Sequence, residues 1–492
     1  MLAWVHQQEN QAVPVSSLWY GFQELILVVR ILIVLPIHWS LAERCGAYNS
    51  THHKRFSSGS LMCFSVIATL LAFALPAFGY AQSLPSDQVP LEYVRTANPK
   101  MHSSVYADGG SGVLGKRSSA GVLGVDSIPN WSSYFYKPAA DGSQYTWQYT
   151  MVGNSPFDKS VDEDDSRDRD NPGGKTTTIE GPVIPVNIDL RNYDGSPRFV
   201  NGVRLYLDAT HLVAPVLSSP VFSNTTYSSS ERPTQFADAV QRAEFFHQAS
   251  DDWHTTLEPH ARKSRTIVLI RGTYSFALYA DGKVAYVIVD ESTFSGKLFP
   301  ATPTDTSTPI AAAEHAGDIH TKDISTFLFN NVFLSNGPGC CVLGFHSYDA
   351  EPGTAENGWK EKRYVLNYSS WVSPGLFEDP TFADVVALSH EMSELFNDPF
   401  LKNATPWYLA PNHNCQNHLE TADGIEGLLN AQYSVSLNNR LWHPQNEALL
   451  QWFAGVTPSS AIDHAYSYPN TTVLTSAPIP MLPNCVVPPP AP

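Results

Sequence analysis

The stretch ALSHEMSELFNDPF, residues 387–400, carries the pattern from which the fold and function of this chain are predicted. Apolar residues recur at helical spacing through it and just before it, which predicts an amphipathic helix packed on a core. The helix is expected to begin near Thr381, after an Asp-Pro pair that can cap its first turn. It should end by Asp398, because the proline that follows disfavours helical geometry there.

Within this helix the residues HEMSE form an HExxE motif. His390 and Glu394 stand one helical turn apart on one face, so both side chains can reach one metal ion. Glu391 points away from that axis and can act as general base on a metal-bound water, as the glutamate of an HExxH helix does. The alternative is an ordinary amphipathic helix that binds no ion.

A third ligand is expected from the segment NCQNHLETADGIEG, which follows the helix after a short loop. Glu420 and Asp423 are the acidic candidates, and His413 and His418 lie in the same segment; each can also be a solvated loop residue. Zn²⁺ accepts imidazole and carboxylate and is the expected cofactor, while the oxygen-rich ligand set keeps Mn²⁺ and Ca²⁺ as alternatives. Each extra carboxylate weakens the effect of the ion on water, so the pattern favours metal binding over peptide hydrolysis.

Strand patterns dominate the chain before this helix. One earlier helix is predicted at residues 235–247, where apolar residues recur at helical spacing. Asp281-Gly282 between two apolar arms predicts a β-hairpin over residues 274–290. Further strands are predicted from Pro182 onward and at residues 266–270, 327–334, 341–346 and 364–368. These elements predict an α+β fold, with a mixed sheet of about five strands packed on the active-site helix.

Composition limits the classes of partner. The chain has 492 residues, of which 43% are hydrophobic and 12% aromatic, so it can bury a substantial core. Its 30 Lys and Arg residues against 47 Asp and Glu residues give a net charge of -17. Such a surface repels the phosphates of nucleic acids and anionic lipids, and no nucleic-acid partner is expected.

The first 81 residues have the character of targeting sequence. A basic patch, an apolar run over residues 61–75 and small residues ending at Ala81 predict a signal peptide over residues 58–81. Residues 1–57 are interpreted as an N-terminal extension that arises from a start codon placed too early; the alternative is a retained membrane anchor. The protein is therefore expected to be secreted, extracellular or periplasmic, with membrane contact only if that segment is an anchor.

The remaining boundaries follow from composition and periodicity. Residues 82–180 are predicted to be a flexible leader with an acidic loop, residues 181–466 the folded α+β domain, and residues 467–492 a Pro-rich tail. Four cysteines follow the signal peptide, and their even number predicts disulfides. Adjacent Cys340 and Cys341 are not expected to bridge each other, and Cys415 is the natural partner for one of them. Cys485 can tether the tail.

The run DVVALSHEMSELFNDPF, the later CQNHLETAD and the aromatic LWHPQNEALLQWFAG resemble uncharacterised exported bacterial proteins that share an HExxE motif, a DP pair and a later ExxD. The upstream GCCVLGFHSY is similar, more distantly, to a strand of the plant EXORDIUM, or phosphate-induced, secreted proteins, which lack the metal-binding residues. The resemblance covers residues 235–453. It implies a zincin-like domain with His390 and Glu394 as ligands, Glu391 as base and an acidic third ligand at Glu420 or Asp423.

The expected function is therefore that of an exported zincin-like metalloprotein, with a metallopeptidase acting on extracellular peptides or proteins as the leading activity. The alternative is a non-catalytic extracellular or cell-wall-associated binding protein on the same fold. His346 is expected near the site at a strand end, where it would support an oxyanion or a ligand, or would be a hydrogen-bonded structural histidine. A serine hydrolase is not supported, because the sequence has no GxSxG elbow.

Overall fold

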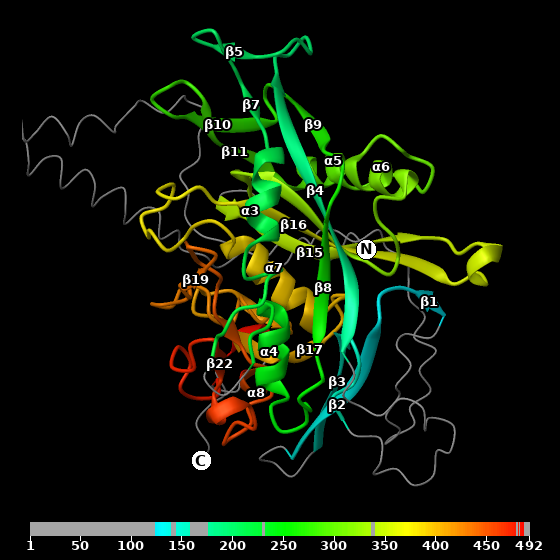
Figure 1. The fold of residues 1–492 in the computed structure, drawn as a ribbon, viewed down its shortest axis with the longest axis vertical. Helices are drawn as coiled ribbons and strands as arrows, with labels where there is room; N and C mark the ends of the chain where they lie inside the picture. Colours follow the sequence, from blue (N-terminus) through cyan, green and yellow to red (C-terminus); the bar gives the residue numbers. More distant parts are fainter. Residues whose placement is uncertain are drawn as a thin grey trace, which may run out of the picture. The chain divides into compact units, whose positions relative to one another are not determined.

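The computed structural model describes residues 124–138, 144–157, 176–228, 232–335, 340–478, 481 and 483–486. These residues all fall within one compact unit, Leu84–Pro492 (Figure 1). The predicted N-terminal extension, signal peptide and acidic loop lie outside the described residues, as does most of the leader. In the described ranges no helix has the length and apolar character needed to cross a membrane.

The main sheet is mixed and largely parallel, and it has eight strands. They are β1 (Val125–Asp126), β4 (Thr177–Arg191), β7 (Tyr206–Leu207), β8 (Thr255–Ala261), β9 (Arg265–Ile270), β12 (Ile324–Asn330), β15 (Gly344–Glu351) and β16 (Glu361–Trp371). β4 pairs in parallel with β8 along its first half, with β9 along its second half and with β12 on its other side. β12 pairs in parallel with β16. β16 in turn pairs antiparallel with β15 (Figure 1).

The long strand β4 explains why the sheet is larger than the predicted five strands. Ten consecutive residues, 181–190, are buried, which is typical of a parallel strand covered on both faces. One strand therefore serves two successive partners along the same edge. β1 and β7 add two residues each, too few to leave a pattern in the sequence.

A second sheet has four strands: β10 (Tyr274–Leu278), β11 (Val284–Asp290), β13 (Val332–Ser335) and β14 (Cys340–Val342). β10 and β11 form the predicted hairpin, with Gly282 at a φ of 85° in its turn. The single strand predicted over residues 327–334 is divided at Asn331, whose φ is 51°, so that β12 joins the main sheet and β13 joins this one.

The α-helices of the described residues are short. They are α3 (Val213–Leu217), α4 (Phe236–Glu244), α5 (Glu291–Leu298), α6 (Pro309–Ala316), α7 (Val386–Asn397) and α8 (Leu450–Phe453). α4 matches the helix predicted at residues 235–247. α7 packs against β15, β16 and α4, and all twelve of its residues are buried. The helix that carries the HExxE motif is thus a core helix, with no solvent-exposed face.

The start of α7 corrects the prediction, whereas its end agrees with it. The carboxylate of Asp379 accepts hydrogen bonds from the backbone and the hydroxyl of Thr381, which makes a local turn instead of a helix cap. Asp384 then pairs with Val372 in a β-bridge and has a φ of 47°, which is not helical. The tertiary bridge therefore delays the helix to Val386.

The remaining elements are two-stranded ribbons and short 3₁₀ turns. The ribbons are β2 (Asn130–Pro138) with β3 (Gln144–Val152), β5 (Phe199–Val200) with β6 (Val203–Arg204), β17 (Ala404–Leu409) with β18 (Cys415–His418), β19 (Val435–Leu437) with β20 (Arg440–Trp442), and β21 (Glu447–Ala448) with β22 (Ser467–Tyr468). The 3₁₀ turns are η2 (Thr210–Leu212), η3 (Ala355–Asn357), η4 (Ile462–His464) and η5 (Pro483–Cys485). β2 and β3 lie within the predicted leader, and Trp131 and Trp147 on them are buried in a core cluster.

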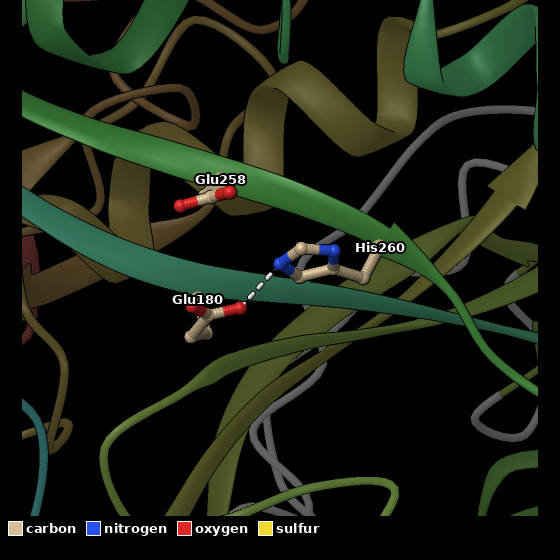
Figure 2. A group of neighbouring side chains, drawn as sticks. All are labelled: Glu180, Glu258 and His260. Atoms are coloured by element: carbon tan, nitrogen blue, oxygen red, sulfur yellow. Dashed lines mark ion pairs between the residues drawn. The ribbon is translucent and has the colours of Figure 1, made fainter.

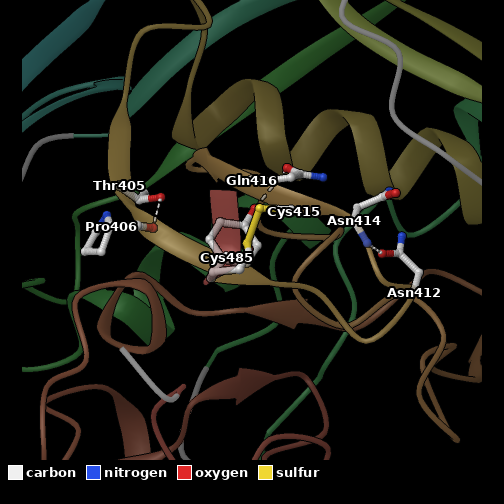
Figure 3. Close-up of a disulfide and its surroundings, with 8 residues drawn as sticks. Thr405, Pro406, Asn412, Asn414, Cys415, Gln416 and Cys485 are labelled. Carbon is white, nitrogen blue, oxygen red and sulfur yellow. Dashed lines mark hydrogen bonds between the residues drawn. A yellow bond between two sulfur atoms is a disulfide. The ribbon is translucent and has the colours of Figure 1, made fainter. Parts of the chain in front are cut away.

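One disulfide joins Cys415 to Cys485, across 70 residues of sequence (Figure 3). This corrects the expectation that Cys415 would pair with Cys340 or Cys341. Cys341 is also disulfide-bonded. Cys485 tethers the described end of the chain to the β17–β18 ribbon, as anticipated for the tail.

Candidate metal centre

Three separate elements bring the predicted site residues together. α7 contributes the three residues of the HExxE motif, β15 contributes His346, and the loop after β18 contributes the two acidic residues. The six residues are His346, His390, Glu391, Glu394, Glu420 and Asp423, and none is more than 4% exposed.

His390 faces three carboxylates through its Nε2 atom. Glu394 Oε1 lies 3.4 Å from this nitrogen, Asp423 Oδ1 3.5 Å and Glu391 Oε1 3.8 Å. Two of these carboxylates lie on α7 with His390, and the third belongs to the loop after β18. The loop is held in place partly because the backbone N–H of Asp423 donates to Glu394 Oε1 at 3.3 Å.

His346 faces a second set of carboxylates. Its Nδ1 atom lies 3.5 Å from Glu391 Oε2 and 3.5 Å from Glu394 Oε2, and its Nε2 atom lies 3.9 Å from Glu420 Oε2. His346 is thus positioned as a potential ligand. The sequence placed it near the site but did not include it among the ligands.

Several buried nitrogen and oxygen atoms of this centre have no hydrogen-bond partner in the described part of the chain. Both ring nitrogens of His346, Nε2 of His390, both carboxylate oxygens of Glu391, Oε2 of Glu394 and Oε2 of Glu420 are buried without a hydrogen-bond partner in the described part of the chain. Leaving such groups unpaired costs roughly 1–3 kcal/mol each, and more for charged groups. No Lys or Arg of the described residues forms an ion pair with Glu391, Glu394 or Glu420. A cation bound between these atoms would satisfy them.

The orientation of His390 is set by Gln445. The side-chain amide of Gln445 donates to the backbone carbonyl of Ala422 at 2.8 Å, so its oxygen must face the imidazole. His390 Nδ1 lies 3.1 Å from that oxygen and therefore carries the ring proton. When the ring is neutral, its Nε2 lone pair is directed at the carboxylates. Metal-ligating histidines are commonly oriented in this way.

The fit of Glu391 depends on a glycine in the facing strand. A Cβ atom placed on Gly344 of β15 would lie 2.5 Å from Glu391 Cγ and 2.6 Å from its Oε1. Real Cβ atoms essentially never make contacts this close. Only glycine therefore lets β15 approach α7 at the carboxylate.

The ionisation of the two motif glutamates differs because of their neighbours. Burial raises the pKa of Glu391 to about 7, although the charge of His390 opposes the shift. Burial also raises the pKa of Glu394, but His390 and His346 outweigh it and lower the pKa to about 2. Burial lowers the pKa of His390, yet Glu394 and Glu391 bring it well above its usual value. The carboxylates of the centre thus stabilise positive charge on the group that faces them.

Further buried acids that were not predicted from the sequence surround the centre. Burial raises the pKa values of Glu426 and Glu447 well above their usual range, and that of Asp398 to about 6. Glu426 can join His390 and Asp423 in a group of potential ligands. Its position three residues after Asp423 is the only sequence feature that could have pointed to it.

The two histidines of the loop are not part of the centre. His413 is exposed, and His418 is half-buried on β18. Neither belongs to any group of potential metal ligands among the described residues.

A separate group of potential ligands lies on the exposed side of β4 and β8. His260 forms an ion pair with Glu180, and Glu258 lies nearby (Figure 2). Both carboxylates are exposed, so water can solvate them. This group has none of the buried, unpaired donors that distinguish the centre on α7.

Comparison of the chain with protein-family models, with curated proteins and with solved structures found no match. The chemistry of the site must therefore be inferred from its own residues. Two imidazoles and at least four carboxylates, buried together, provide nitrogen and oxygen ligands for a divalent transition metal such as Zn²⁺ or Mn²⁺.

Proposed function

We propose that this protein is an exported, zincin-like metalloprotein, and that its centre on α7 serves a metal-dependent hydrolase or peptidase. The observation that carries the proposal is the convergence of buried imidazole and carboxylate atoms that have no hydrogen-bond partner. His390, Glu394 and Asp423 are the proposed ligands from the motif and the loop. Nε2 of His390 lies 3.4 Å from Glu394 Oε1 and 3.5 Å from Asp423 Oδ1, and each distance is close to the spacing of about 3.3–3.5 Å between two ligands of a tetrahedral zinc ion.

An ion held there would supply Lewis acidity, which polarises a carbonyl and lowers the pKa of water. The chain itself would supply the base. Glu391 directs Oε1 toward His390 and is fixed by the approach of Gly344, so it can accept a proton beside the ion without moving. Gln445 would keep the Nε2 lone pair of His390 available throughout.

Export is supported by the disulfide between Cys415 and Cys485. Disulfides persist in oxidising compartments and are rare in the cytosol. This agrees with the signal peptide proposed from the sequence and with an extracellular or periplasmic location. A peptide or protein in that compartment is the proposed substrate.

A second candidate is a non-catalytic extracellular binding protein that uses the same centre structurally. It is favoured by the burial of the donors, because none of the six is more than 4% exposed. A structural ion is closed off by its ligands, whereas a catalytic ion keeps one position open to substrate.

Metal binding is tested by elemental analysis of the purified protein, alongside His390→Ala. The matched control is His254→Ala, because His254 also pairs with a buried carboxylate, Asp238, at 2.7 Å but belongs to no group of potential metal ligands among the described residues. We expect stoichiometric Zn²⁺ or Mn²⁺ in the wild type and in the control, and a loss in His390→Ala. A wild type without stoichiometric metal would refute the proposal.

Catalysis is tested by Glu391→Gln on a panel of fluorogenic peptides, with exposed Glu258→Gln as the control. A hydrolase should keep its metal and lose about 10²–10⁴-fold in rate when the base is removed. If the wild type cleaves no peptide and Glu391→Gln alters only stability, the binding-protein alternative holds.

A further inference from the structure

Within the described ranges, the potential ligands of the centre form three groups, one of which contains His390, Asp423 and Glu426. The other two groups share one carboxylate. One group contains His390, Glu391 and Glu394, and another contains His346, Glu394 and Glu420. Glu394 uses a different oxygen for each: Oε1 lies 3.4 Å from His390 Nε2, and Oε2 lies 3.5 Å from His346 Nδ1. The two imidazoles therefore face the same carboxylate through different oxygen atoms.

One ion cannot serve both groups in this arrangement. Ligands bound to one ion at about 2.0–2.2 Å lie within about 4.4 Å of one another. In the described residues, no set of donors within 4.8 Å of one another contains both His346 and His390. A single ion bound by Glu394 and both imidazoles would require such a set.

His346 also needs a partner of its own. It is 2% exposed, and neither ring nitrogen has a hydrogen-bond partner, although an imidazole always carries at least one N–H. Its three neighbouring carboxylate oxygens stand at 3.5–3.9 Å, beyond hydrogen-bond distance but at the spacing of ligands around an ion. A purely structural histidine would be hydrogen-bonded to them directly.

On these grounds we propose that the centre is dinuclear: Glu394 bridges two divalent ions, one held by His390 and the other held by His346 with Glu420. The proposal rests on the proposed function and extends it.

Paired metal ions about 3.5–4 Å apart are a recognised arrangement for displacement and hydrolysis reactions. In such a centre Glu391 would face both ions, because Oε1 lies 3.8 Å from His390 Nε2 and Oε2 3.5 Å from His346 Nδ1. The same glutamate could then accept a proton from a water between the two positions.

The test uses the metal stoichiometry of the purified full chain and the electron paramagnetic resonance of the Mn²⁺-loaded protein. We expect two ions per wild-type chain with an exchange-coupled signal. His346→Ala should hold one ion with a mononuclear six-line signal, and His346→Gln, which keeps the polarity of the side chain, should do the same if the alanine variant does not fold. His254→Ala should retain two ions.

The outcomes separate this inference from the proposed function. One ion in the wild type, unchanged in His346→Ala, would overturn the dinuclear centre and leave the metalloprotein proposal standing. Two ions in both the wild type and His346→Ala would also overturn it, because His346 would then hold neither ion. A wild type without metal would refute the proposed function itself.

Discussion

Replacing Gly344 by alanine tests the packing of the centre without reference to any bound ion. The new Cβ would lie 2.5 Å from Glu391 Cγ, about 0.9 Å short of the 3.4 Å at which ordinary contact begins. Neither partner can yield toward solvent, because β15 is buried at this point and Glu391 is 0% exposed. Overpacking of this kind costs about 1–3 kcal/mol in the free energy of unfolding.

The decisive measurement is a double-mutant cycle with Glu391→Ala. Alanine at position 391 removes the Cγ and carboxylate that the new Cβ would meet, so Gly344→Ala should become nearly neutral in that background. We expect a coupling free energy of about 1–3 kcal/mol between the two substitutions. Urea unfolding of the four proteins, all in excess chelator, measures it without a contribution from metal binding.

Gly181→Ala provides the control for adding a methyl group to a buried strand. Its Cβ would meet Leu257 Cβ at 3.4 Å, an ordinary contact, and it should change stability little in either background. The steric account is refuted if Gly344→Ala destabilises the protein equally with and without the Glu391 side chain. It is also refuted if Gly344→Ala costs no more than Gly181→Ala.

Three further outcomes are expected. Burial raises the pKa of Glu244 to about 8 in the folded protein, from the ordinary value of 4.5. Between these two pH values the folded protein keeps a proton on Glu244 that the unfolded chain has released. The contribution of this group to stability is therefore fully present below pH 4.5 and is lost as the pH rises toward 8. Glu244→Gln should therefore stabilise the protein by a few kcal/mol at pH 8 and by almost nothing at pH 4, measured by urea unfolding at both values; an equal effect at both would contradict the shift. Cys485→Ser removes the disulfide to Cys415, which spans 70 residues of sequence. The loss should lower the free energy of unfolding by up to about 4 kcal/mol, from the entropy of the unfolded chain, and should speed proteolysis of the C-terminal end. Unchanged unfolding and cleavage would exclude a stabilising tether. Gln445→Leu should weaken metal affinity about 10–100-fold in competition with a chromogenic chelator, because the ring of His390 loses its orienting acceptor, and an unchanged affinity would show that Gln445 has no such role.

Much of the fold could be predicted from local patterns. The hairpin of β10 and β11 was recognised from Asp281-Gly282 between apolar arms, since turn chemistry depends on neighbouring residues. The break between β12 and β13 was not predicted, although Asn330 and Asn331 interrupt the apolar run over residues 327–334. That each half pairs with a different sheet, with the chain bent at Asn331, was decided by the tertiary structure.

The pairing of the cysteines was likewise decided by the tertiary structure, although the presence of disulfides was predicted from the sequence. Their even number predicted disulfides, but no local pattern states which cysteines meet. Cys415 lies on β18 and Cys485 comes close only after the C-terminal segment has packed against β17 and β18. A disulfide across 70 residues is a consequence of tertiary folding.

For the centre, the sequence by itself determined the spacing of His390, Glu391 and Glu394, because a helix repeats every 3.6 residues and places i and i+4 on one face. It also supplied the acidic residues of the following loop as candidates. Only the tertiary structure decided that the helix is buried on every side, that His346 faces the same carboxylates from β15, and that Gln445 orients His390 across 55 residues. The physical reason is range: helical periodicity arises from contacts within one turn, whereas the surroundings of a buried donor depend on strands and loops that meet only after the sheet has formed.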